Sequence, residues 1–345
     1  MLPFLNILRP VFLVLPLLAA YMMYSNATKS GLDTMITQHC PPTLVSQEET
    51  PFRLPYTGLF LDGTLCGIVT VFQTGLNSDI TLKFLSYFLA SGLPLLVFQV
   101  VEADRPRQNA LIASPMIFAL AGQCVTFAVV QPLYWFLFLH SSSSLRATGL
   151  HPANMHVTQA QAEAILFAIS IGAIVPTVCL ILMNDPQVTA IWQIFPVFIS
   201  LSYSLHHYFR PSTLHPQSGY KTIQAVYIIS FILASSTHIA IIWPMINDIQ
   251  SFVLTFVPSV NPLPKSMPLD SLVRQLLQWD FVFTFIPAHI GSLWFAATYW
   301  ELLLLVTWNI LALPIIGPGA TISAILLWRE SQIQQHYDGG KIHRD

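Results

Sequence analysis

Asp62, Glu102 and Asp280 are three of the carboxylic acids that lie in or at the edges of long apolar stretches of this sequence. An ionisable side chain in such surroundings is costly, so each acid is a functional candidate. Burial disfavours the charged form of a carboxyl group, and a shielded Asp or Glu can therefore stay protonated at neutral pH and act as a general acid. These positions predict acid–base chemistry in an apolar environment.

Two tryptophans are the best candidates for the wall of a pocket. Trp192 adjoins Gln193, and Trp294 lies in the middle of an apolar stretch. The face of an aromatic ring stabilises a nearby cation by about 0.5–2 kcal/mol. Shielded acids together with aromatic faces suit protonation of an epoxide or an olefin, followed by cyclisation of the carbocation.

Each of these candidates also has a purely structural interpretation. Glu102 precedes Arg105 by about one helical turn, and the two can form an ion pair at the membrane interface. Asp62 can lie in a solvated loop, and Asp280 can be an acid at a helix N-terminus. His238, near the middle of an apolar stretch, can be a hydrogen-bonded core residue. The sequence leaves these alternatives open.

Metal and nucleotide chemistry lack the motifs that they need. The sequence contains no His-box set for a di-iron centre, no Asp-rich magnesium motif, no nucleophile elbow and no P-loop. The cysteines lack C-x-x-C spacing and are interpreted as small core residues; they are Cys40, Cys66, Cys124 and Cys179. The sequence therefore predicts no metal site and no cofactor.

The elements that position these residues are predicted from the apolar composition. Only 9% of the 345 residues are charged, against roughly a quarter in soluble chains, and a stretch of about 18 apolar residues can cross a bilayer as a helix. We expect an all-α, polytopic transmembrane bundle that forms one domain over residues 1–345. Its eight or nine spans are expected at residues 2–24, 57–76, 80–101, 111–140, 158–183, 188–209, 223–246, 279–300 and 302–328.

The ends and loops of this bundle carry further expectations. Residues 1–24 form the first span, an uncleaved anchor in preference to a cleaved signal peptide. Residues 25–56 and 247–278 are long extramembrane loops, and Asn26 begins the one N-x-[S/T] acceptor for glycosylation. The net charge of −2 and the scattered cations exclude a nucleic-acid partner.

Counting the spans places several polar residues at one level of the bilayer. If residues 57–76 cross the membrane, the third span returns to the side on which residues 25–56 lie. A pocket open to that side would then bring together Asp62, Glu102, Asn109, Trp192, Gln193 and Asp280.

A series of short motifs extends over residues 99–330. The motifs are EADRPRQN at 102–109, QPLY at 131–134, IWQIFP at 191–196, TH at 237–238, LQWD at 277–280, GPGA at 317–320 and WRE at 328–330. In this order and spacing the chain resembles the fungal integral-membrane terpene cyclases of meroterpenoid pathways, of the ascochlorin, ascofuranone and macrophorin type.

This resemblance implies a cofactor-independent cyclase of the isomerase or lyase type that acts on a farnesyl-bearing, epoxidised precursor. A carboxylic acid would protonate the epoxide oxygen, and a base would remove the final proton. Glu102 and Asp280 are expected as acid and base in undetermined order, with Asp62 as a third candidate. The substrate-binding residues would be Asn109, Gln193 and His238, which orient the acids, and Trp192 and Trp294, which line the path of the cation.

The resemblance also implies a multi-pass protein of the endoplasmic reticulum. Its partners would be a lipophilic prenylated substrate, membrane lipids and other enzymes of the pathway. Two other functions remain open. A small-molecule or proton-coupled transporter would use the same acids as proton sites, and an accessory membrane scaffold would not need them.

Overall fold

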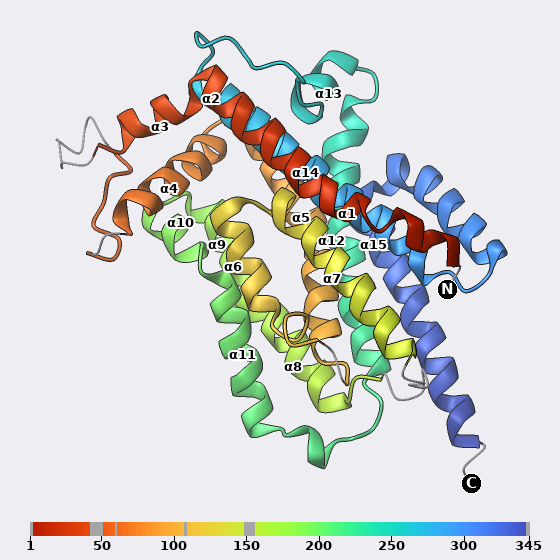
Figure 1. The fold of residues 1–345 in the computed structure, drawn as a ribbon. Coiled ribbons are helices and arrows are strands. Elements are labelled where there is room, and N and C mark those ends of the chain that lie inside the picture. The colour runs from red at the N-terminus through yellow and green to blue at the C-terminus, as the bar shows by residue number, and fades with distance from the viewer. Residues whose placement is uncertain (1–2, 42–50, 59–60, 107–108, 148–155, 343–345) are drawn as a thin grey trace.

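The computed structural model describes residues 3–41, 51–58, 61–106, 109–147 and 156–342, and their regular structure is helical apart from one isolated β-bridge between Thr158 and Ser218 (Figure 1). The expected all-α class is confirmed. The helices are α1 (Val11–Ala20), α2 (Asn26–Ser30), α3 (Leu32–His39), α4 (Asp62–Leu76), α5 (Asp79–Ala103), α6 (Pro115–Val125), α7 (Phe127–Ala147), α8 (Gln159–Ile169), α9 (Val175–Met183), α10 (Pro186–Trp192), α11 (Phe195–Phe209), α12 (Tyr220–Ile242), α13 (Ile249–Phe256), α14 (Leu269–Ser292) and α15 (Tyr299–Ile342). Shorter 3-10 or π segments are η1 (Pro3–Leu8), η2 (Tyr21–Ser25), η4 (Ser170–Ile174), η5 (Ser212–Leu214), η6 (Trp243–Met245) and η7 (Leu293–Phe295).

Five helical stretches in the described part of the chain are long and apolar enough to cross a membrane. They are Leu5–Ser30, Asp79–Ala103, Gln159–Met183, Tyr220–Met245 and Tyr299–Asp338. Helices α10 and α11, bent by 57° where they meet, form a sixth if they act as one span. Eight or nine crossings are therefore not confirmed. Of the two segments expected as long loops, residues 25–56 contain α2 and α3, and residues 247–278 contain α13 and the beginning of α14.

Two of the expected spans have a different structure from the one predicted. Helix α4 has 15 residues, which corresponds to about 22 Å and is short for a hydrocarbon layer of about 30 Å. The expected span at residues 111–140 is broken at Thr126, whose φ of 75° ends α6 and separates it from α7. A positive φ is uncommon for a β-branched residue, so the sequence gives no signal for this break.

The short α4 changes which residues lie at the same end of the bundle. At the first end, the Asn184 side chain between α9 and α10 donates to Asn77 Oδ1, between α4 and α5, at 2.8 Å. At the second end, where α11 ends and α8 begins, Arg210 pairs with Glu163. Helix α5 runs from the first end to the second (Figure 1). Glu102, near the C-terminus of α5, therefore lies at the second end.

The prediction that all six polar residues lie at one level of the bilayer is therefore wrong. Asp62 belongs to the first end, since its carboxylate and that of Asp185 both act on the hydroxyl of Tyr56. Glu102 and Asn109 lie about the full length of α5 away from it. The physical reason is that α4 does not complete a crossing, so α5 leaves the first end instead of returning to it.

Two of the cysteines form a disulfide bond. Cys40, after α3, is bonded to Cys66 in α4, and the two Cα atoms are 5.8 Å apart. The interpretation of all four cysteines as small core residues is wrong for this pair. The two are 26 residues apart, and the sequence contains no local motif that would join them. Cys124 and Cys179 are free thiols.

A kink divides α15 and explains the surroundings of His238. Pro318 has no N–H, so the carbonyl of Pro314 lacks its helical partner. His238 Nε2 lies 3.2 Å from that carbonyl oxygen, and the hydroxyl of Tyr87 lies 3.0 Å from His238 Nδ1. Because a carbonyl only accepts, Nε2 carries the proton and Nδ1 accepts from the tyrosine. His238 thus stabilises the kink.

The kink also requires glycine at position 317, which predicts a large effect of Gly317→Ala. Gly317 has a φ of 85°, and a Cβ atom there would lie 2.6 Å from His238 Nδ1. The backbone strain and the clash together are expected to cost about 2–4 kcal/mol of stability, seen as a lower thermal unfolding midpoint in detergent. Gly63→Ala is the control, because its Cβ would meet nothing within 4 Å. Equal midpoints for the two variants would contradict this account of the kink.

Candidate active site

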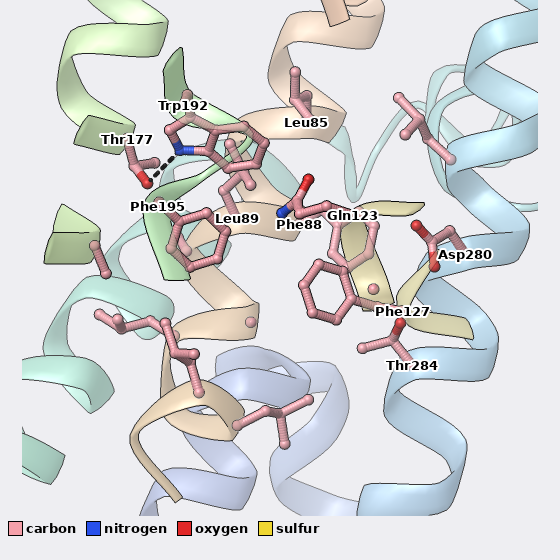
Figure 2. A pocket seen from close by; sticks show the side chains of 18 of the residues that line it. Leu85, Phe88, Leu89, Gln123, Phe127, Thr177, Trp192, Phe195, Asp280 and Thr284 are labelled. Carbon is pink, nitrogen blue, oxygen red and sulfur yellow. Dashed lines mark hydrogen bonds between the residues drawn. The ribbon is translucent and has the colours of Figure 1, made fainter. Parts of the chain in front are cut away.

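A cavity of about 520 Å³ lies inside the helical bundle (Figure 2). This volume is within the range of about 300–1,000 Å³ that small-molecule sites usually have. The lining residues come from α4, α5, α6, α7, α9, α11, α12 and α14, with Trp192 from α10 and Ala173 and Ile174 from η4. Most are aliphatic or aromatic; the polar ones are Ser86, Gln99, Gln123, Thr126, Gln131, Thr177, Thr237, Asp280 and Thr284.

Among the described residues that line this cavity, Asp280 is the one acid and none is Lys, Arg or His. The break at Thr126 exposes the N-terminus of α7, and the backbone N–H of Ala128 donates to Asp280 Oδ1 at 2.6 Å. Thr284, one turn further along α14, directs its hydroxyl toward the same carboxyl group (Figure 2). Asp280 lies in the middle of α14, so the expected position at the N-terminus of its own helix is wrong; its carboxylate instead caps α7 and lines the cavity.

Three glutamines add polar groups to the cavity wall. Gln99 Nε2 donates to Gln131 Oε1 at 3.2 Å, which joins α5 to α7. The Nε2 group of Gln123 is buried and has no partner among the described residues. Figure 2 shows Gln123 between the Trp192 side of the cavity and Asp280. These glutamines had no place among the predicted site residues, although amides inside apolar stretches were a usable signal.

An aromatic wall faces the acid across the cavity. Trp192 Nε1 donates to Thr177 Oγ1 at 3.1 Å, which fixes the indole ring. Its ring centroid lies 5.3 Å from that of Phe195 and 5.0 Å from that of Phe72. Phe88 and Phe127 complete the aromatic lining. The expected position of Trp192 in a pocket wall matches this arrangement, and the ring faces can stabilise a cation.

Three other predicted residues lie outside the cavity lining. Asp62 accepts hydrogen bonds from Thr57 and from the Gly58 N–H, in the turn before α4. Asn109 is exposed and its side chain caps a loop. Gln193 is buried, and its amide donates to a carbonyl of its own helix.

Two further candidates, His238 and Trp294, lie close to the cavity or deep in the core. His238 is turned toward the kink of α15, whereas its neighbour Thr237 lines the cavity. Trp294 is buried and packs edge-on against Phe12, at 5.6 Å between ring centroids. The structure therefore brings Trp192 and Asp280 together and does not gather the other predicted residues around them.

Glu102 lies in a buried ion cluster at the second end. It is paired with Arg105 and with Arg329, each at 2.6 Å, and Arg105 also pairs with Glu330. The guanidinium carbon of Arg329 lies 4.7 Å from the centroid of the Phe295 ring. Two acids and two cations thus neutralise each other in a site with almost no exposure. The expected ion pair of Glu102 with Arg105 is present as part of a larger cluster.

The described residues contain no group of three or more His, Cys, Asp or Glu side chains that could hold a metal ion. The functional groups that the described lining offers are a carboxyl group, side-chain amides, hydroxyl groups and aromatic rings. The described residues thus form an apolar, aromatic cavity with one acid and no basic residue in its lining.

The chain belongs to the CtvD-domain family, whose profile matches residues 8–333. It is 29% identical over 288 residues to the terpene cyclase ascI of Acremonium egyptiacum, which covers 76% of this chain and 73% of that protein. The terpene cyclase ctvD of Aspergillus terreus is 25% identical over 284 residues, 78% of this chain and 75% of that protein. These similarities confirm the resemblance and the expectation of an enzyme with terpene cyclase activity.

A third relative has a different name. The FAD-dependent monooxygenase verC1 of Penicillium polonicum is 27% identical over 251 residues, which are 65% of this chain but 30% of that protein. The chain therefore spans about a third of the length of this relative. No solved structure matches the chain.

Proposed function

We propose that this chain is a membrane-embedded cyclase that binds a farnesyl-bearing, terminally epoxidised substrate in the cavity. The observation that carries the proposal is that Asp280 is the one acid among the described residues in the wall of a mainly apolar and aromatic cavity. The hydrogen-bond partners that the structure gives to Asp280 are neutral, whereas Glu102 is paired with two guanidinium groups. Asp280 is therefore the better proton donor of the two.

In the proposed reaction the carboxylic acid of Asp280 donates its proton to the epoxide oxygen. The bond from that oxygen to the more substituted carbon breaks, and the nearest olefin of the farnesyl chain supplies the electron pair for the new carbon–carbon bond. Each ring closure moves the positive charge along the chain, past the rings of Trp192, Phe88 and Phe127. Loss of a proton ends the reaction, and the Asp280 carboxylate is the one anionic acceptor among the described lining residues.

The epoxidised form of the substrate is supported by one of the relatives. Monooxygenases are the class of enzymes that convert an olefin to an epoxide. The relative verC1 is named a monooxygenase, and about 30% of its length is similar to this chain. The prenyl part of the substrate is supported by the names of ascI and ctvD. The apolar lining suits a lipophilic chain that enters from the bilayer.

The test of this function is conversion of a terminally epoxidised farnesylphenol by microsomes that contain the chain. We expect a cyclised isomer of identical mass, formed without added metal or nucleotide. Movement of the unchanged compound into sealed vesicles would support the transporter instead. Product formation that continues after Asp280 has been replaced would support the scaffold.

We also propose a location in the membrane of the endoplasmic reticulum, with the first end of the bundle in the lumen. The support is the Cys40–Cys66 disulfide, because disulfides form in oxidising compartments. The six candidate spans would cross the bilayer. The eight or nine crossings expected from the sequence would require α6, α7 and α14 to cross as well.

This orientation predicts a cytosolic C-terminus. Helix α15 ends far from α3 and α13, at the opposite end of the bundle (Figure 1). A tag added after the last residue is expected to be digested by protease in sealed microsomes, while a lumenal marker protein stays intact. Protection of the tag until detergent is added would contradict the proposed orientation.

A further inference from the structure

A second cavity, of about 240 Å³, lies next to the first and between α5, α6 and α11. Leu96 of α5 lines both cavities. On α11, Phe195 lines the first cavity and the adjacent Pro196 lines the second. On α6, Gly122 lines the first cavity and Ala119, one turn earlier, lines the second. The two cavities are therefore neighbours along three helices.

The second cavity contains an acid that is not fully satisfied. Tyr203 donates its hydroxyl to Asp104 Oδ1 at 2.9 Å. The other carboxylate oxygen, Oδ2, is buried and has no partner among the described residues. Ser200, one turn before Tyr203 on α11, adds a second hydroxyl to the lining. The cavity opens beside Ser204, which is exposed.

An unpaired buried acceptor is costly, at about 1–3 kcal/mol, and a ligand that brings a hydroxyl group removes this cost. We propose that the second cavity is the subsite for the hydroxyl-bearing ring of the substrate, whose prenyl chain lies in the first cavity. This inference rests on the proposed function and adds the polar part of the substrate to it. The ring hydroxyl donates to Asp104 Oδ2, and the serine hydroxyl of Ser200 lies in the same wall.

The dimensions and charges of the second cavity agree with this assignment. A cavity of roughly 150 Å³ holds a benzene ring, so 240 Å³ accommodates a ring with polar substituents. Asp104 lies eight residues beyond Leu96, about 12 Å along α5, which separates the ring from the reacting end of the chain. Burial raises the pKa of Asp104 to about 7, against the opposing effects of Tyr203 and Arg105.

The test compares two probes, para-farnesylphenol and its methyl ether, in binding to the full-length chain in detergent by calorimetry. The ether retains the ring and the chain and lacks only the donor. At a pH above the pKa of about 7 of Asp104, the wild-type chain is expected to bind the phenol about 10- to 100-fold more tightly, the effect of one hydrogen bond to a charged group. Asp104→Ala is expected to bind both probes equally, with the affinity for the ether unchanged.

Three further variants make the result specific. Tyr203→Phe, which changes the site less, is expected to reduce the preference for the phenol several-fold. Asp248→Ala, which removes an exposed acid that caps α13, and Asp280→Asn should both retain the preference. Equal binding of the two probes by the wild-type chain, or a full preference in Asp104→Ala, would overturn the inference. Absence of epoxide conversion by a chain that still prefers the phenol would refute the proposed function and leave the subsite standing.

Discussion

Asp280→Asn is expected to lower the turnover of the epoxidised substrate by about 100- to 10,000-fold, which is the usual contribution of a general acid. Asparagine has nearly the same shape and cannot donate a carboxyl proton. Its side-chain oxygen can still accept the hydrogen bond from the Ala128 N–H that now ends on Oδ1. The helix cap therefore persists, and the thermal midpoint of the variant should stay close to that of the wild-type chain.

Asp185→Asn is the matched control for this variant. Asp185 also caps a helix, α10, by accepting from the N–H groups of Gln187 and Val188 at 2.8 and 3.0 Å. It does not line the cavity. Initial rates with microsomes normalised to the amount of folded protein should be near the wild-type value for this control. Full activity of Asp280→Asn would remove the acid from the mechanism.

Glu102→Gln has the largest expected effect on stability. Among the described ion pairs of this buried cluster, the substitution leaves Arg105 and Arg329 with Glu330. Removing one partner of a buried ion pair costs about 3–5 kcal/mol, because the remaining charge is uncompensated. The thermal midpoint in detergent is expected to fall strongly. At a temperature where the variant is still folded, its turnover per folded molecule should be close to that of the wild-type chain.

The thermal midpoint and the turnover per folded molecule together decide between the structural and the catalytic interpretation of Glu102. Arg329→Gln should be destabilised to a similar degree, since it breaks the same cluster from the other side. Glu163→Gln is the control, because its pair with Arg210 is partly exposed and such pairs contribute about 0–1 kcal/mol. If Glu102→Gln kept the wild-type midpoint and lost its turnover at least 100-fold, Glu102 would be a catalytic acid.

Local features of the sequence were sufficient to select two residues that line the cavity, whose part in a reaction stays a prediction. An acid beside Trp279 in an apolar stretch identified Asp280, and the Gln193 neighbourhood identified Trp192 as a cavity wall. The all-α class follows from the long apolar stretches. In a bilayer the backbone N–H and C=O groups of such a stretch must find hydrogen-bond partners within the protein, and a helix provides them within the stretch itself. Glu102 was correctly paired with Arg105 as one alternative, because the two are three residues apart in the sequence.

Long-range features could not be predicted in the same way. Arg329 and Glu330 are more than 220 residues from Glu102, and no local pattern joins them to it. The end of the bundle at which each residue lies depends on whether α4 crosses the membrane. The sequence predicted that it does, and Glu102 was therefore expected at the end opposite to the one where it lies. The break at Thr126 places Ala128 against Asp280, although threonine does not favour a positive φ.

The most direct measurement for the central claim is the origin of the oxygen in the product. The purified chain is incubated with a terminally epoxidised farnesylphenol in water labelled with heavy oxygen, and the product is examined by mass spectrometry. Protonation by Asp280 followed by olefin attack predicts a cyclised isomer with the mass of the substrate and no label, because the epoxide oxygen becomes the hydroxyl group. A product heavier by one labelled water would show that water attacks the epoxide or the final cation, and would contradict cyclisation that ends in the loss of a proton.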